Sequence, residues 1–256
     1  MKRRVCIAGI TGWVGRPLAD AVTAADDLEL AAGVARRAAG ETLHGAAILA
    51  SVPEALAKPF DVLVDYTSAE AVKANVLAAI AARRHVVVGS SGLSDDDFEE
   101  IGHRARANGV GVIAVGNFAI SAALLGRFAA EAAKHFPAWE IIDFAHDTKV
   151  DAPSGTAREI AWRLGRAGSP RPAVSVGKSV GPRESRGANI SGTQVHSLRV
   201  PGNTIAVEVH FGRDDERLTL RYEGGAGAAP YIAGTLLAIR RVPAVTGVMR
   251  GLDAVL

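Results

Sequence analysis

In the first 115 residues, short runs of β-branched apolar residues alternate with longer alanine-rich stretches. This alternation predicts a parallel β-sheet with helices on both faces. The strands are expected at Arg4–Ala8, Glu29–Ala35, Asp61–Asp65, His85–Val88 and Val110–Val115. The helices are expected at Val14–Ala25, Ala69–Arg83 and Asp95–Asn108. Ser94 precedes the last of these and is a good N-cap residue, with three aspartates in the first turn behind it.

The pattern changes in the second half of the chain. A helix at 121–136, a strand at 139–145 and a helix from Thr156 are followed by a Gly-, Ser-, Pro- and Arg-rich loop over 168–189. Apolar residues then alternate with polar ones over 204–211, the period of a strand with one face in water. A turn at 212–216 completes a hairpin, and 231–241 is expected to form the last helix before an apolar tail.

These elements predict an α/β protein of two domains. A Rossmann-type, doubly wound parallel sheet is expected over 1–116, completed by 230–256. The intervening residues 117–229 are expected to form a second, α+β domain with a mixed or antiparallel sheet. Clefts between two domains are common ligand sites, so we expect a small molecule to bind there.

Composition excludes several classes of protein. The 256 residues are 48% hydrophobic and 22% charged, which is typical of a globular protein and not of a disordered or fibrous one. Lys and Arg number 29 against 27 Asp and Glu, a net charge of +2, too balanced for a nucleic-acid-binding surface. The single cysteine, Cys6, lies in an apolar run and is expected in the core, which fits a reducing cytoplasm. No metal site is predicted.

Two segments resemble membrane signals without fulfilling their requirements. The basic start at 1–4 and the apolar run after it are interrupted by glycines and by Arg16-Pro17, so no signal peptide is expected. The apolar stretch 110–126 is broken by Gly116-Asn117 and Ser121, so no membrane span is predicted.

A glycine-rich turn follows the first strand with the spacing GxxGxxG. Gly9 would make the turn, Gly12 would let the backbone approach a pyrophosphate, and Gly15 would let helix pack on strand. The position after a first strand favours a dinucleotide site over a purely structural turn. The cofactor residues expected here are Gly9, Thr11, Gly12, Trp13, Val14 and Gly15.

Two arginines, Arg36 and Arg37, follow the second strand, where NAD-binding proteins carry an acidic residue for the ribose. Guanidinium groups favour bidentate contact with phosphate, so NADPH is expected in preference to NADH. The alternative is a solvated charge pair, with use of both cofactors.

The segment 140–157 runs from strand through loop into helix. Gly155 precedes the expected helix start and would leave backbone N–H groups open to an anion, and Lys149 adds a positive charge nearby. Together they predict a carboxylate clamp. The structural alternative is that Thr156 and Glu159 form a capping box.

On these residues the chain resembles the dihydrodipicolinate reductase family, the NAD(P)H-dependent 4-hydroxy-tetrahydrodipicolinate reductases of lysine and diaminopimelate synthesis. Lys149-Val-Asp-Ala-Pro-Ser-Gly-Thr-Ala157 is the family signature almost letter for letter. The resemblance implies that Lys149, Gly155 and Thr156 hold substrate carboxylates, and that the enzyme is a homotetramer built through the second domain's sheet. It also implies further cofactor contacts at Tyr66, Thr67, Gly89, Ser90, Ser91, Gly116, Asn117 and Phe118.

The sequence departs from this family at three points. The family's two adjacent histidines are Ala145-His146 here, its later substrate-binding arginine falls at Ala228, and its Gly-Glu-His segment before Phe211 is not recognisable. His146 is the candidate proton donor in place of the lost histidine, with Asp143 or Asp147 orienting it. The alternative is that His146 is a structural hydrogen-bonding residue.

Three functions remain open at this point. The first is an NADPH-dependent reductase that transfers hydride to the cyclic, unsaturated carboxylate of the lysine pathway, with Lys149 and His146 as catalytic residues. The second is a related imine or keto-acid reductase whose substrate differs because Ala145 and Ala228 remove two polar groups. The third is a catalytically silent NADPH sensor, disfavoured because such a protein would not need an intact carboxylate clamp.

Overall fold

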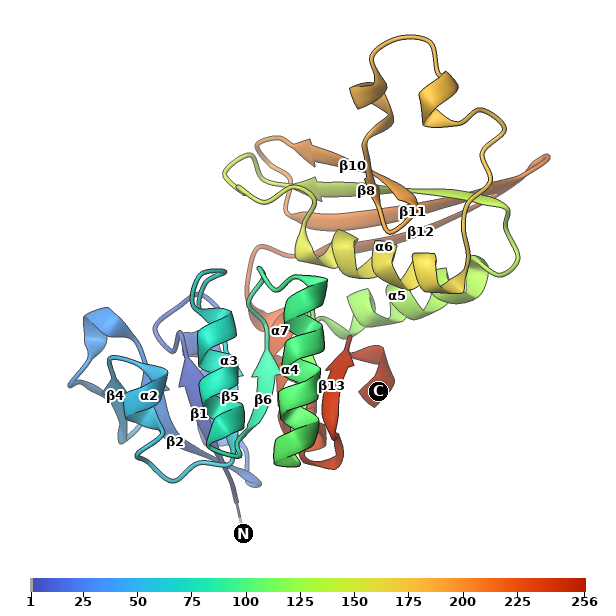
Figure 1. Cartoon of the computed structure of the whole chain (residues 1–256). Helices are drawn as coiled ribbons and strands as arrows, with labels where there is room; N and C mark the ends of the chain where they lie inside the picture. The colour runs from blue at the N-terminus through green and yellow to red at the C-terminus, as the bar shows by residue number, and fades with distance from the viewer. Residues whose placement is uncertain (1) are drawn as a thin grey trace. The chain divides into compact units, whose positions relative to one another are not determined.

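The structure is a computed structural model that describes residues 2–256, and these form two compact units. The first unit contains the residues up to Phe118 together with Ala228–Leu256, and the second contains Ala119–Gly227. Each has its own sheet and its own hydrophobic core. The expected α/β architecture with a second mixed-sheet domain is confirmed (Figure 1).

The sheet of the first unit has eight strands in the order β13-β7-β6-β5-β1-β2-β4-β3. Within residues 2–256, its neighbouring strands run parallel except β3 and β4, which are antiparallel. The strands are β1 (Arg3–Ala8), β2 (Leu28–Val34), β3 (Thr42–Leu43), β4 (Ala46–Leu49), β5 (Val62–Asp65), β6 (His85–Val88), β7 (Gly111–Ala114) and β13 (Gly247–Arg250). The interior strands β5 and β7 are buried along their whole length, as a parallel sheet covered on both faces requires.

Helices cover both faces of this sheet (Figure 1). They are α1 (Gly15–Ala24), α2 (Val52–Ala55), α3 (Val72–Ala81), α4 (Asp95–Asn108) and α7 (Ala229–Arg241), with short 3-10 turns η1 (Arg36–Ala38), η4 (Val242–Ala244) and η5 (Asp253–Val255). Helix α4 has the predicted bounds, because Ser94 and Asp97 form a capping box and Gly109 ends the helix in the left-handed conformation. Cys6 is fully buried, and burial raises the pKa of its thiol to about 12, so its expected place in the core is confirmed.

The second unit carries a five-stranded mixed sheet in the order β12-β11-β8-β10-β9. Its strands are β8 (Ala138–Ala145), β9 (Ala188–Ile190), β10 (Thr193–Arg199), β11 (Ile205–Arg213) and β12 (Glu216–Gly224). Strand β10 runs parallel to β8, whereas β11 pairs with β8 and β12 in the antiparallel sense. Burial along β8 alternates residue by residue, so one face of this sheet is covered and the other is not.

Helices α5 (Ile120–Ala132) and α6 (Gly155–Ala167) pack on the covered face (Figure 1). Their apolar residues meet Trp139, Ile141, Val207 and Phe211 of the sheet in one core. The expected long loop after α6 contains two short 3-10 turns, η2 (Val176–Lys178) and η3 (Arg183–Arg186).

The sequence pattern missed several short elements. Strands β3, β4, β9 and β10 and helix α2 were not predicted, and the apolar tail contains β13, which extends the parallel sheet beside β7. Within residues 2–256, no helix combines the length and the apolar character that crossing a membrane requires.

Candidate functional site

The predicted cofactor residues follow five parallel strands of the first unit, β1, β2, β5, β6 and β7. Parallel strands end at the same edge of the sheet, so the loops after them form one surface there. Open α/β sheets bind their ligands at this edge. The residues concerned are Gly9–Gly15, Arg36, Arg37, Tyr66, Thr67, Gly89–Ser91 and Gly116–Phe118.

The glycine turn needs its glycines for close backbone packing. Gly9 has φ +83°, and a Cβ on it would lie 2.2 Å from the carbonyl oxygen of Tyr66. A Cβ on Gly15 would lie 2.0 Å from the carbonyl oxygen of Gly9. Helix α1 has no side-chain cap, and among residues 2–256 the N–H groups of Trp13, Val14 and Gly15 find no backbone acceptor. The turn can therefore take an anion at the helix start.

Arg36 and Arg37 form the first residues of η1 and are exposed to solvent. The residues just before them, Val34 and Ala35, supply no carboxylate for a ribose. Two cations therefore stand free to meet a phosphate at the end of β2.

A buried carboxylate, which the sequence interpretation missed, joins two of the cofactor loops. Asp65 is fully buried at the end of β5. It accepts hydrogen bonds from the Thr67 backbone N–H (3.0 Å) and hydroxyl (2.7 Å), from the Ser90 hydroxyl (2.6 Å) and from the Asn75 amide (2.8 Å). The loops after β5 and β6 are thus held by one side chain. The sequence signal that could have identified Asp65 is its position as the one polar residue at the end of the otherwise apolar strand β5.

Tyr66 packs at the centre of this edge. A Cβ on Gly89 would lie 2.2 Å from the Tyr66 ring, and the ring centroid of Phe118 lies 5.9 Å from that of Tyr66. Burial raises the pKa of the Tyr66 phenol, so this group stays protonated and donates to the Thr235 hydroxyl at 2.7 Å. Gly116 and Asn117 lead from β7 to Phe118, and Asn117 and Phe118 are buried.

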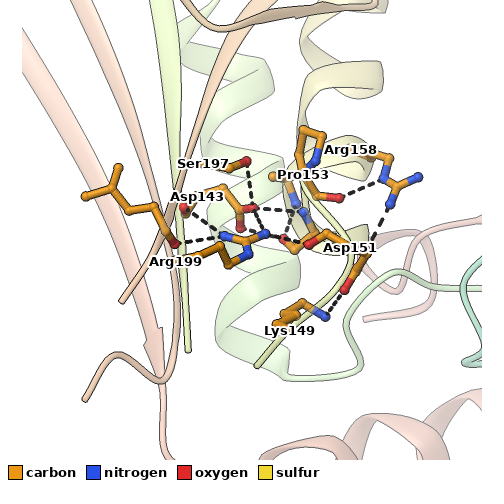
Figure 2. A network of polar contacts seen from close by, with 10 residues as sticks. Asp143, Lys149, Asp151, Pro153, Arg158, Ser197 and Arg199 are labelled. Atoms are coloured by element: carbon orange, nitrogen blue, oxygen red, sulfur yellow. Dashed lines mark hydrogen bonds and ion pairs between the residues drawn. The ribbon is translucent and has the colours of Figure 1, made fainter. Parts of the chain in front are cut away.

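The predicted carboxylate clamp lies in the second unit, in the loop between β8 and α6. The Lys149 ammonium lies 2.7 Å from a carboxylate oxygen of Asp151, with 31% of the lysine side chain exposed (Figure 2). Arg158, on the first turn of α6, lies 3.9 Å from the other oxygen of Asp151 and donates to the carbonyl of Pro153 at 2.9 Å. Lys149 is therefore held in the loop by its own carboxylate partner.

Helix α6 begins earlier than predicted. Its N-cap is Ser154, whose hydroxyl accepts a hydrogen bond from the Ala157 N–H at 3.2 Å, so the alternative of a capping box formed by Thr156 and Glu159 is wrong. Glu159 instead pairs with Arg163 at 3.0 Å. Gly155 and Thr156 are the first two helical residues, the position at which backbone N–H groups attract anions.

His146 lies exposed just after β8. Its Nδ1 atom is 2.7 Å from a carboxylate oxygen of Asp147 and 3.0 Å from the Thr148 hydroxyl. Of the two aspartates considered as its partner, Asp147 makes the contact. Asp143 is fully buried and binds other groups, so the idea that it orients His146 is wrong.

Asp143 instead pairs with Arg199, the last residue of β10, which the sequence interpretation also missed. The guanidinium lies 2.8 Å from the buried carboxylate. No local pattern identifies this arginine, because it lies 56 residues from its partner and depends on the parallel pairing of β10 with β8. The two alanines that replace family polar groups, Ala145 and Ala228, are both buried.

The second unit also contains a cavity of about 820 Å³ at the far end of β8. Trp139, Glu140, Arg186, His210 and Phe211 are among its lining residues. None of the predicted site residues lines it. Within residues 2–256, no group of three or more His, Cys, Asp or Glu side chains is placed to hold a metal ion.

Comparison with known proteins gives one consistent result. Residues 3–118 match the family model "Dihydrodipicolinate reductase, N-terminus" and residues 121–256 match "Dihydrodipicolinate reductase, C-terminus". The 4-hydroxy-tetrahydrodipicolinate reductase of Beutenbergia cavernae is 38% identical to this chain, and the match covers 100% of this chain and 99% of that protein. The 4-hydroxy-tetrahydrodipicolinate reductase of Moorella thermoacetica is 35% identical, and the match covers 99% of this chain and 97% of that protein. A dipicolinate-bound dihydrodipicolinate reductase from Paenisporosarcina sp. TG-14 is 27% identical with a TM-score of 0.81, covering 100% of both chains.

Proposed function

Because the chain belongs to the dihydrodipicolinate reductase family, we propose that it reduces 4-hydroxy-tetrahydrodipicolinate with NADPH in lysine and diaminopimelate synthesis. The chain is an NAD(P)H-dependent oxidoreductase of this family. The observation that carries the substrate assignment is the loop 149–156, which presents a held ammonium group beside the start of α6.

The first unit fits a dinucleotide. The turn at Gly9 and Gly15 leaves no room for a side chain, and the N–H groups at the start of α1 are available to a pyrophosphate. Arg36 and Arg37 would bind the 2′-phosphate that distinguishes NADPH from NADH, with NADH as a weaker alternative. When bound, the reduced nicotinamide supplies the hydride. The loops held by Asp65 would line its binding site.

In the second unit, Lys149 would bind a substrate carboxylate together with the N–H groups of Gly155 and Thr156. An ammonium and helix-terminal amides both bind a carboxylate through charge-assisted hydrogen bonds. The related enzyme bound to dipicolinate, a pyridine dicarboxylate, supports a ligand of this chemistry. Because Asp151 contacts Lys149 at 2.7 Å, the loop keeps the ammonium in place before substrate arrives.

The reduction also requires a proton. His146 would donate it, with Asp147 orienting the ring through the contact at Nδ1. A positioned acid contributes about 10²–10⁴-fold in rate, so this residue would set much of kcat. Lys149, three residues further along the same loop, would be the second catalytic residue.

We further propose a homotetramer assembled through the sheet of the second unit. The sheet face opposite α5 and α6 bears the apolar residues Ile142 and Phe144 of β8, both partly exposed, and Leu198 of β10, which pairs with Phe144 and is 41% exposed. Burial of such a face is an ordinary way to assemble subunits. The buried, protonated thiol of Cys6 accords with a cytoplasmic enzyme.

The central test is NADPH oxidation with enzymatically generated 4-hydroxy-tetrahydrodipicolinate. We expect turnover above about 1 s⁻¹, ordinary for an enzyme. Lys149→Ala should raise KM by about 10- to 100-fold because a charge-assisted hydrogen bond is lost. Lys134→Ala is the matched control, since Lys134 is an exposed lysine of the same unit that also pairs with a carboxylate, Glu131 at 2.6 Å. Absence of turnover at high enzyme concentration would refute the proposal.

A further inference from the structure

We propose that Arg199 is a positioning residue of the carboxylate clamp, fixing both the loop that carries Lys149 and the start of α6. This inference rests on the proposed function of that clamp. Arg199 lies outside the signature segment and reaches it only through the fold.

The guanidinium of Arg199 bridges a strand and a loop (Figure 2). Its Nη2 atom donates to the Asp143 carboxylate at 2.8 Å and to the backbone carbonyl of Asp151 at 2.7 Å. Its Nη1 atom donates to the backbone carbonyls of Leu198 at 2.9 Å and Asp143 at 3.3 Å. Arginine suits this place because its planar fork of donors serves several fixed acceptors at once.

One arm of the bridge reaches the start of helix α6. Asp143 accepts hydrogen bonds from the Ser154 backbone N–H at 2.8 Å and from its hydroxyl at 2.6 Å. The Ser154 oxygen in turn accepts from the Ala157 N–H, which caps the helix. The orientation of the Gly155 and Thr156 N–H groups therefore depends on a carboxylate whose charge Arg199 balances.

The other arm reaches the lysine. Arg199 holds the backbone of Asp151, and the side chain of Asp151 contacts the Lys149 ammonium at 2.7 Å. The two halves of the clamp, the ammonium and the helix amides, are thus both positioned from one guanidinium. Loss of the guanidinium would let them move relative to one another.

Burial makes this pair sensitive to change. The side chain of Asp143 is 0% exposed and that of Arg199 is 15% exposed. Water therefore cannot replace the hydrogen bonds and the opposite charge that Asp143 would lose if Arg199 were substituted. Arg199→Lys keeps the positive charge that Asp143 needs, but a single ammonium does not reproduce the planar fork that serves Asp143 and Asp151 together. This variant should therefore fold while losing the bridge.

The experiment compares Arg199→Lys with the parent enzyme in KM, kcat, NADPH Kd and Tm. Displacement of a binding group by about 1 Å can cost about 10²-fold, so we expect kcat/KM to fall by about that factor. The loss should lie mainly in KM, because the clamp binds the carboxylate equally in ground and transition states. NADPH Kd should not change, since its proposed site is in the other unit. A kcat/KM within threefold of the parent would overturn the proposal.

Arg213→Lys provides the matched control. Arg213 is an exposed arginine of the same unit that pairs with Glu216 at 2.6 Å, and its replacement should leave KM unchanged. Should Arg199→Lys fail to fold, the double variant Asp143→Asn with Arg199→Met removes both charges and keeps an oxygen that accepts from Ser154. We expect it to fold and to show the same rise in KM, and a parental KM in it would overturn the proposal.

Binding of dipicolinate by calorimetry separates this inference from the proposed function. If the parent lacks reductase activity but binds dipicolinate at least tenfold more tightly than Arg199→Lys, the positioning role stands and the reaction assignment fails. If the parent is active and Arg199→Lys equals it in KM and in dipicolinate Kd, the positioning role fails alone. A parent that neither turns over nor binds dipicolinate overturns both.

Discussion

The hydroxyl groups of Tyr66 and Thr235 lie 2.7 Å apart, joining the loop after β5 to helix α7 across 169 residues. Thr235 also donates to the Tyr231 carbonyl at 2.8 Å, so Tyr66 is the donor in this pair. The contact fixes the phenol ring against Gly89 and Phe118 at the edge of the sheet where the cofactor is proposed to bind.

A double-mutant cycle of Tyr66→Phe and Thr235→Val should show a coupling of about 1 kcal/mol in the free energy of unfolding, the net value of a neutral hydrogen bond. Urea unfolding of the four proteins measures it. Additive effects of the two substitutions would show that the contact does not stabilise the fold.

Gly89→Ala should weaken NADPH binding and destabilise the first unit by about 1–3 kcal/mol, because the added Cβ would overlap the Tyr66 ring at 2.2 Å. Fluorescence titration and thermal unfolding are the measurements. Gly225→Ala is the control, since a Cβ there meets nothing within 4 Å. Equal NADPH affinity in both variants would contradict the expectation.

Replacing Arg36 and Arg37 by alanine together should raise the Kd for NADPH by about 10- to 100-fold and leave the Kd for NADH nearly unchanged. The reason is the loss of charge-assisted hydrogen bonds to the 2′-phosphate. Arg104→Ala, at an exposed arginine of α4 that pairs with Glu100, serves as the control. A parallel loss of affinity for both nucleotides would argue against a 2′-phosphate site.

The start of α4 should be sensitive to acid. Lys73, together with Ser94, lowers the pKa of Asp97 from 3.8 to about 2. A lowered pKa means that the ionised carboxylate stabilises the fold above pH 4, and that this contribution is lost as the pH falls from about 4 to about 2. The stability difference between the parent and Asp97→Asn, measured by urea unfolding, should therefore shrink over this interval. A difference that stays constant from pH 7 to pH 2 would exclude this origin.

Cys6 should not react with thiol reagents at pH 8 in the native protein, because burial raises its pKa to about 12 and the reactive thiolate is absent. Labelling followed by mass spectrometry tests this, with the urea-denatured chain as the positive control. Stoichiometric labelling of the native protein would show that the strand β1 opens readily.

Local sequence determined those elements whose boundaries depend on neighbours within about four residues. Ser94, Asp97 and Gly109 define α4 completely, since a capping box and a left-handed C-terminal residue act over one turn. The same holds for the glycine turn, where the spacing of Gly9 and Gly15 already predicts close packing of strand and helix. The signature from Lys149 to Thr156 is likewise contiguous, so it identified the family and led to the proposed clamp.

Prediction from the local sequence pattern failed where an element depends on a residue or strand that is distant in the sequence. Thr156 and Glu159 have the spacing of a capping box, yet Ser154 caps α6 because the buried Asp143 holds its backbone and hydroxyl. Strand β13 was missed because its four residues carry little periodic signal and gain their place from pairing with β7.

The sequence by itself thus determined the two-domain α/β plan, and it predicted the turn proposed to bind the nucleotide and the residues of the proposed clamp. Only the tertiary structure decided what holds them in place: Asp65 between two loops, and Arg199 between Asp143 and Asp151. The physical reason is that a buried ion pair or hydrogen-bond network needs partners adjacent in space. This adjacency follows from the strand order of the sheet. Strand β10 lies beside β8, although 47 residues separate the end of β8 from the start of β10.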